Sequence, residues 1–285
     1  MDRTRALVAI ALATIAAAVS PAGAQSLQLS YEHEFGAYGY RFENPSTFDT
    51  AQLVAHFFEQ KYDTNNDWLV GRVVYGQTWR ATTEAAIARD ATRSATDFDT
   101  FFDPTGDVIT SGTSGDATLR SWRVRQTIGV RTWRPASAGQ YWYGGYSFRR
   151  DRAEFGPGNK SVTHTSPPST EYSIVTTRET TDSDVHEILV GVADEAGAGR
   201  WTVAWNVDAV PATFARLTVL LPDKYPGQPL RFMATSVGAD AELRLRRRTG
   251  PLSVEFRIRA GGARSYRHAS EFSRHAIVAG VGVSW

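Results

Sequence analysis

The last nine residues, Ile277 to Trp285, constrain the fold more than any other stretch of the chain. Apolar residues stand at 277, 279, 281, 283 and 285, whereas Ser or Gly stands at 280, 282 and 284. Alternation with a period of two predicts a β-strand that has one apolar face and one face of small side chains. We therefore expect the chain to end inside a sheet, with its final residue still part of the pattern.

The other end has the features of a secretory signal peptide over residues 1–24. A basic start is followed by an apolar run from Ala6 to Val19 and by an Ala-x-Ala site at 22–24. The apolar run is too short, and its flanks are wrong, for a membrane-spanning helix. The expected mature chain is residues 25–285, and no later apolar run is long enough to span a membrane as a helix.

The body of the mature chain consists of alternating segments separated by turn signals. Ten such segments carry apolar residues on one parity and polar or charged residues on the other, which is the pattern of half-buried strands. The segments are 27–35, 51–60, 69–79, 119–133, 141–151, 185–193, 201–209, 237–245, 252–258 and 277–285. Long and short connections alternate. The run Asp63 to Asp67 is interpreted as a tight turn, and long loops are expected near 81–117, 155–182 and 210–229.

The terminal strand and the loop rhythm resemble bacterial outer-membrane β-barrel proteins, whose last strand ends in an aromatic residue. The resemblance implies an all-β fold, a transmembrane antiparallel up-and-down barrel with ten strands and a range of eight to twelve. It also implies a location in the bacterial outer membrane with both termini in the periplasm. Its expected partners are outer-membrane lipid and lipopolysaccharide, and the barrel-assembly machinery through the C-terminal strand.

The charge balance excludes some functions. Removing Asp2, Arg3 and Arg5 from the 31 basic and 30 acidic residues leaves 29 of each, so the mature chain has no basic footprint for nucleic acid. The chain has no Cys, which excludes disulfides and thiol chemistry. No cofactor motif is present.

The inward parity of the strands is crowded with charged side chains of both signs. Because buried charges must be paired or hydrated, this set predicts either an ion-pair network that fills the lumen or an ion path lined with arginine, and the mixed signs favour the filled lumen. The predicted network is Glu32, Glu34, Arg72, Arg123, Arg125, Arg131, Arg149, Glu187, Asp240, Glu242, Arg244, Glu255, Arg257 and Arg259.

One short motif gives candidate catalytic residues. Asp97 and Asp99 form an Asp-x-Asp in the expected second outer loop, and Asp184 and His186 form an Asp-x-His at the start of a strand. With the ten-strand architecture, this resembles the omptin proteases, which carry an Asp pair opposite an Asp-His pair. In that family the Asp-x-His belongs on the fourth outer loop, and residues 210–229 of this chain contain no His. The resemblance is therefore incomplete.

A second use of the same acidic loop is metal binding. Asp99, Asp103 and Asp107 offer the hard oxygen ligands that Ca²⁺ prefers, although a solvated loop explains the same residues. The six His have no metal-ligand spacing.

Taken together, the sequence favours a structural or surface-interaction role for a barrel with a charge-filled lumen, and not an enzyme. The alternatives are a small-solute channel and an omptin-like hydrolase at the outer face. The Pro- and Ser-rich stretch 156–182 is expected to be a mobile surface loop or to form a hairpin around Tyr172 to Thr177, and it is the surface feature most suited to contact a partner.

Overall fold

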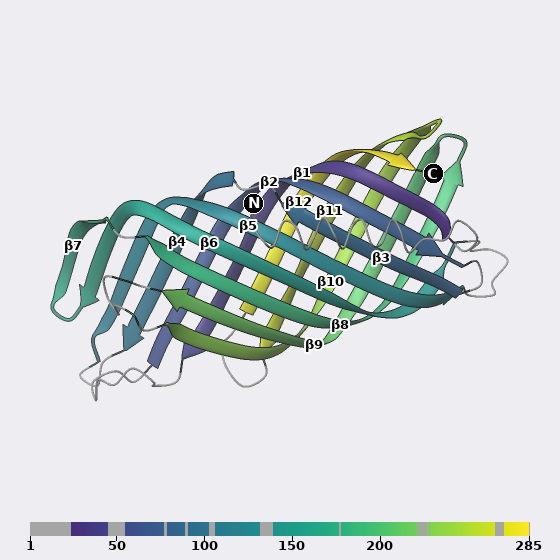
Figure 1. The fold of residues 1–285 in the computed structure, drawn as a ribbon. Coiled ribbons are helices and arrows are strands. Elements are labelled where there is room, and N and C mark those ends of the chain that lie inside the picture. Colours follow the sequence, from purple (N-terminus) through teal and green to yellow (C-terminus); the bar gives the residue numbers. More distant parts are fainter. Residues whose placement is uncertain are drawn as a thin grey trace.

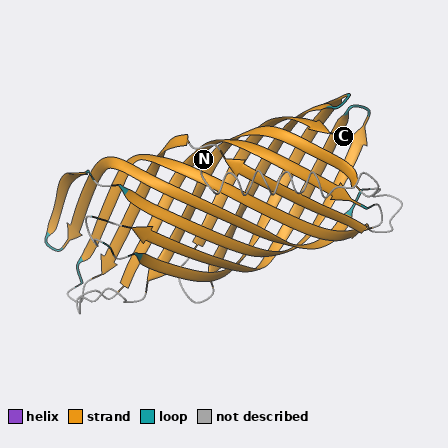
Figure 2. Ribbon diagram, in the orientation of Figure 1, coloured by secondary structure: helices purple, strands orange, loops and turns teal. Residues whose placement is uncertain are grey.

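A computed structural model describes residues 24–44, 55–76, 79–88, 91–102, 106–131, 139–176, 178–220, 222, 227, 229–265 and 271–284. These residues form twelve β-strands, and no helix among them is long and apolar enough to cross a membrane. The strands are β1 (Ala24–Asn44), β2 (Ala55–Tyr75), β3 (Trp79–Ala88), β4 (Ala91–Phe102), β5 (Val108–Arg131), β6 (Tyr141–Thr165), β7 (Pro168–Val175), β8 (Glu179–Ala198), β9 (Trp201–Leu220), β10 (Leu230–Thr249), β11 (Leu252–Ser265) and β12 (Glu271–Ser284). Figures 1 and 2 show them winding around one closed, tilted barrel.

The barrel has ten strand positions, all antiparallel. β3 and β4 lie end to end in one position, because each pairs with β2 on one side and β5 on the other, and β7 pairs only with β6. The ring closes where β1 pairs with β12, in register from Gln28↔Ser284 to Arg41↔Glu271. The predicted all-β antiparallel barrel with ten strands is therefore confirmed, and the described part of the terminal strand is the closing strand.

The sequence predicts the correct number of strand positions, ten, only because two errors in the predicted segments cancel. The predicted turn from Asp63 to Asp67 lies in the middle of β2, so the segments 51–60 and 69–79 belong largely to one strand. In the register of β2, Thr64 and Asn66 are buried inward, and Asp63 and Asp67 lie on the outward face. The expected loop 81–117 is instead largely strand, supplied by β3, β4 and the first half of β5.

The expected loop 210–229 is also wrong in its first half, because β9 continues to Leu220. The pairing of β9 shifts by one residue on both sides, between Ala209 and Ala212 against β8 and between Val210 and Thr213 against β10, which places a β-bulge around Pro211. Proline cannot donate a backbone hydrogen bond and is tolerated within sheets at bulges. Before the bulge the odd-numbered residues of β9 face outward, and after it the even-numbered residues do, Phe214 among them. The alternation in the sequence is therefore interrupted, although the strand continues.

The strands are about twice as long as a membrane requires. β5 to β10, apart from β7, have 20 to 25 residues each, whereas a tilted transmembrane strand needs about 9–11. We call the part of the barrel that adjoins Ala24 and Ser284 the proximal section, and the opposite part the distal section. The two sections differ in what they bury.

The proximal section is apolar outside and charged inside. Its outward side chains include Leu29, Leu69, Ile258 and Ile277, all more than 40% exposed, while carboxylates such as Glu32 face the lumen and are buried. A lipid-facing wall has this arrangement, because only apolar side chains can face hydrocarbon.

The distal section has the opposite arrangement. Lys61, Arg216 and Arg264 point outward with side chains 60% exposed or more. The lumen there contains one cluster of aromatic and aliphatic side chains contributed by nine strands. This section therefore has the polarity of a soluble protein, with an apolar core and a charged surface.

Beyond the distal rim, β6 and β7 form a hairpin that turns between Thr165 and Pro168, and not around Tyr172 to Thr177. The expected loop 155–182 is therefore largely strand, supplied by the end of β6, by β7 and by the start of β8. Figure 1 shows the hairpin at the end of the barrel far from the C-terminus. Asp107 holds the hairpin turn: its carboxylate accepts hydrogen bonds from the backbone N–H groups of Thr165 and Ser166, both at 2.8 Å, and from His164 Nδ1 at 3.0 Å. These bonds, first that from His164, lower the pKa of the Asp107 carboxyl below its usual range.

We predict that acid loosens this hairpin. A carboxyl whose pKa is lowered by folding stabilises the folded form above the ordinary aspartate pKa of about 3.9, and the stabilisation is lost as the pH falls further. Hydrogen exchange of residues 158–175, corrected for the intrinsic rate, should therefore accelerate below that pH. Asp107→Asn should exchange faster already at neutral pH and respond less to acid, whereas Asp116→Asn, which changes an exposed Asp on β5, should behave as the native chain. An acid response that survives in Asp107→Asn would contradict the assignment.

Candidate functional site

The site described here is the lumen, since most of the candidate charged residues converge there. Thirteen side chains form the ion pairs of the proximal lumen, and all come from inward positions of the strands around it. They are Glu32, Glu34, Arg72, Glu84, Arg123, Arg125, Asp208, Glu242, Arg244, Arg246, Glu255, Arg257 and Arg259. Seven are arginines and six are carboxylates, so the set carries one net positive charge.

Arg257 is the centre of this network. Its side chain is 1% exposed and contacts three carboxylates, those of Glu32, Glu255 at 3.0 Å and Glu242 at 3.8 Å. A buried guanidinium is stable only with such compensation. Gly280 stands opposite Glu32 in the β1–β12 register, and a Cβ atom there would approach Glu32 Cγ to 3.0 Å. The small residue in the terminal strand therefore leaves room for the carboxylate.

Other pairs join strands that are separated around the ring. Arg125 on β5 donates to Asp208 on β9 at 2.8 Å, and Asp208 is fully buried. Arg123 on β5 lies 3.9 Å from Glu34 on β1. These contacts span strands that are not neighbours in the sheet, so the network ties the walls of the barrel together as well as filling it.

The remaining predicted network residues lie apart from this set. Arg149 pairs with Asp151 at 2.7 Å, and Asp240 pairs with Arg274 at 2.6 Å. Arg149, Asp240 and Arg274 line the small space next to Tyr38, where the charged lumen meets the aromatic cluster. Glu187 lines the same space, and Arg131 is exposed at the proximal end of β5.

Sequence reasoning missed two parts of the lumen. Glu84 pairs with Arg72 at 2.5 Å, but it lies in β3, which was expected to be loop. The aromatic cluster was missed because most of its members stand on the inward parity beyond the predicted segments, as Tyr40, Phe42 and Phe155 do. The cluster crosses the lumen: Phe58 on β2 stacks on Phe232 of β10 at 5.5 Å, and Tyr62 meets Phe155 of β6 at 5.6 Å.

The four catalytic candidates do not converge. Asp97 and Asp99 face the distal lumen, where both are almost completely buried, and Gln60 donates to Asp97 at 2.9 Å. Asp184 and His186 have the outward parity of β8. His186 packs on the Phe148 ring at 4.7 Å. The barrel wall separates the two pairs, so they cannot share a water molecule, as general-base catalysis would require.

The metal candidates do not form a site either. Asp99 faces the lumen, Asp107 holds the β6–β7 turn, and Asp103 lies outside the described residues. Within the described ranges, no group of three or more potential ligands is placed to hold a metal ion.

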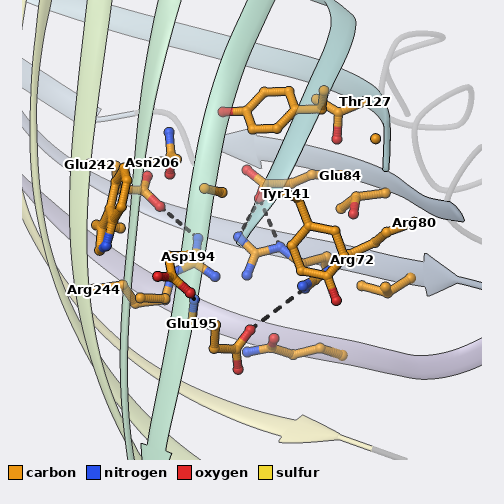
Figure 3. Close-up of a pocket in the computed structure, with 18 of the residues that line it drawn as sticks. Arg72, Arg80, Glu84, Thr127, Tyr141, Asp194, Glu195, Asn206, Glu242 and Arg244 are labelled. Atoms are coloured by element: carbon orange, nitrogen blue, oxygen red, sulfur yellow. Dashed lines mark hydrogen bonds and ion pairs between the residues drawn. The ribbon is translucent and has the colours of Figure 1, made fainter. Parts of the chain in front are cut away.

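The proximal mouth of the lumen contains a cavity of about 260 Å³ (Figure 3). We call it the vestibule. Its lining includes seven arginines and four carboxylates, namely Arg72, Arg80, Arg125, Arg244, Arg246, Arg248, Arg259, Glu84, Asp194, Glu195 and Glu242.

Comparisons with known proteins agree with the architecture. No protein-family model and no curated protein matches the chain. The outer-membrane protease OmpT from Escherichia coli superposes with a TM-score of 0.64 at 8% identity, over 93% of this chain and 97% of that one. The translocator domain of autotransporter NalP from Neisseria meningitidis has a TM-score of 0.25 at 11% identity, over 98% of this chain and 95% of that one. An outer-membrane channel from Pseudomonas putida F1 has a TM-score of 0.32 at 7% identity, over 92% of this chain and 96% of that one. Both scores are too low to support an argument.

At such identities the likeness concerns the fold alone, and the protease activity named for OmpT remains a property of that protein. The apolar outer wall, the closed ring and this likeness together show the fold of the bacterial outer-membrane β-barrels.

Proposed function

We propose that this chain is a closed outer-membrane barrel with a structural or surface-interaction role. One observation carries the proposal: side chains from strands that are not neighbours in the sheet meet across both sections of the lumen. Arg125 reaches Asp208 in the proximal section, and Phe58 stacks on Phe232 in the distal section. Water-filled channels leave the lumen open, whereas this lumen is packed with paired charges and then with an apolar core.

The orientation completes the proposal. With both termini in the periplasm, the distal section stands outside the cell as a rigid extension of the barrel, and the β6–β7 hairpin is among its outermost parts. Tyr172 and Ile174 of that hairpin are 83% and 73% exposed. Large exposed apolar side chains on a rigid scaffold suit contact with another molecule.

The filled lumen argues against the alternative of a small-solute channel. Purified protein added to a planar lipid bilayer should therefore produce no discrete conductance steps. Its altered electrophoretic mobility before and after heating would show that the barrel was folded in the same preparation. Reproducible steps with a defined ion selectivity would contradict a closed lumen and favour the channel.

We further propose that the outer wall binds phosphate groups of outer-membrane lipid, lipopolysaccharide included. Arg150 on β6 and Arg216 on β9 share one carboxylate, that of Asp184 on β8, with donor–acceptor distances of 2.5 to 2.8 Å. The three side chains lie side by side across neighbouring strands and carry one net positive charge. Just proximal to them, Phe148 and Phe214 occupy the outward face, so the cluster stands where the apolar wall ends. Lipid phosphates lie at that depth, and arginine binds them bidentately.

The lipid proposal predicts that replacing both arginines weakens binding of lipopolysaccharide. Arg150→Gln with Arg216→Gln should lower the affinity of the detergent-solubilised barrel at least about tenfold, because a charge-assisted hydrogen bond contributes about 1.5–3 kcal/mol. Arg264→Gln, which removes an exposed outward arginine from β11, should leave the affinity unchanged. If both variants lost the same affinity for lipopolysaccharide, the binding would depend on general surface charge, and the proposed site would be contradicted.

A further partner, the barrel-assembly machinery, is proposed to engage the C-terminal strand. The support is the period-two pattern of β12 and its place at the closing seam with β1.

A further inference from the structure

We propose that the vestibule at the proximal mouth is a binding site for a small oxyanion, a phosphate or a carboxylate. The vestibule lies at the end of the barrel opposite the surface loops, so its ligand binds from the proximal side, whatever the distal section contacts.

The floor of the vestibule is held in place by ion pairs. Arg72 donates to Glu84 at 2.5 Å, and Arg259 donates to Glu242 at 2.6 Å. Arg244 donates to the other oxygen of Glu242, also at 2.6 Å. Each of these arginines is fixed by a carboxylate, so their positions are set before any ligand arrives. A preorganised site avoids the entropic cost of ordering its own side chains.

The rim differs from the floor, because its arginines are held weakly. Arg80 on β3 lies 3.7 Å from Glu195 and also covers the Tyr141 ring (Figure 3). Arg248 on β10 donates to the Ser284 hydroxyl, and no carboxylate pairs with it among the residues that the structure describes. These two side chains come from different strands and reach the cavity from different walls.

The charge of the vestibule favours an anion. Its lining holds seven arginines against four carboxylates. Two carboxylates outside the lining also pair with these arginines: Asp208 with Arg125 and Glu255 with Arg246. Counting all six still leaves one more cation than anion. Each guanidinium carries five N–H donors, more than its carboxylate partners can accept, and none can act as an acceptor.

The size and shape of the cavity narrow the ligand. A volume of about 260 Å³ is slightly smaller than the ~300–1,000 Å³ of typical small-molecule pockets, so the ligand is small. Guanidinium groups match the two oxygens of a carboxylate or a phosphate, which a halide lacks. The packed lumen closes the inner side of the vestibule, so a ligand enters and leaves by the same mouth, and the site binds without transport.

The test is titration calorimetry on the full-length folded barrel in detergent, at constant ionic strength, with inorganic phosphate and with citrate as separate probes. The native barrel should bind at least one of them saturably. Arg246→Gln with Arg248→Gln should weaken that binding at least tenfold. Arg247→Gln is the matched control: it lies between them on β10, but its guanidinium covers the outward Trp201 ring at 5.5 Å, so its binding should equal that of the native barrel.

Heat-dependent electrophoretic mobility would show that each variant is a folded barrel. The proposal is overturned if neither probe binds saturably to the native barrel. It is equally overturned if the Arg246/Arg248 variant binds as tightly as native, or if Arg247→Gln loses as much affinity as that variant, since the anion would then be held by general surface charge. The identity of the probe that binds distinguishes a phosphate site from a carboxylate site.

Discussion

The structure depends on one constraint: the proximal wall faces a solvent that offers no hydrogen bonds. Every backbone group in that wall must be paired within the sheet, and a closed ring is the arrangement of strands that achieves this. The seam between β1 and β12 closes the ring over fourteen consecutive residue pairs. Because the outer face of the wall must be apolar, and because side chains alternate between the two faces of a strand, the polar side chains of this section point into the lumen. Their charges must then be paired with one another in a narrow space. Arg257 and its three carboxylates are the centre of that solution.

The distal section buries apolar side chains and exposes charged ones, as soluble proteins do. The change from a charged interior to an apolar interior occurs within single strands. On β1, Glu32 and Glu34 face the lumen in the proximal section, and Tyr40 and Phe42 face it further along on the same parity. A single strand thus supplies a charged interior and then an apolar one. The second interior closes the barrel as firmly as the first, because its rings meet across the lumen.

The inversion explains what could be predicted from the sequence. Where strands face lipid, alternation is strong, so the closing strand and the charged inward residues such as Glu242 and Arg259 were within reach. Where strands leave the lipid, the outward face becomes polar, and a strand such as β4 has the composition of a loop. The bulge at Pro211 hid the second half of β9 for another reason, since it reverses parity. Convergence across the lumen could not be predicted, because the pairing of Arg125 with Asp208 depends on barrel closure and not on sequence spacing.

The central claim is that the membrane covers the proximal section only, and the absence of Cys from the chain makes this directly measurable. Ile258→Cys and Arg264→Cys place one thiol each on the outward face of β11, six residues apart. Barrels folded into lipid vesicles would be treated with a water-soluble maleimide that does not enter bilayers. The account predicts rapid labelling at position 264 and none at 258 until the protein is denatured. Equal labelling at the two positions in the folded barrel would contradict it.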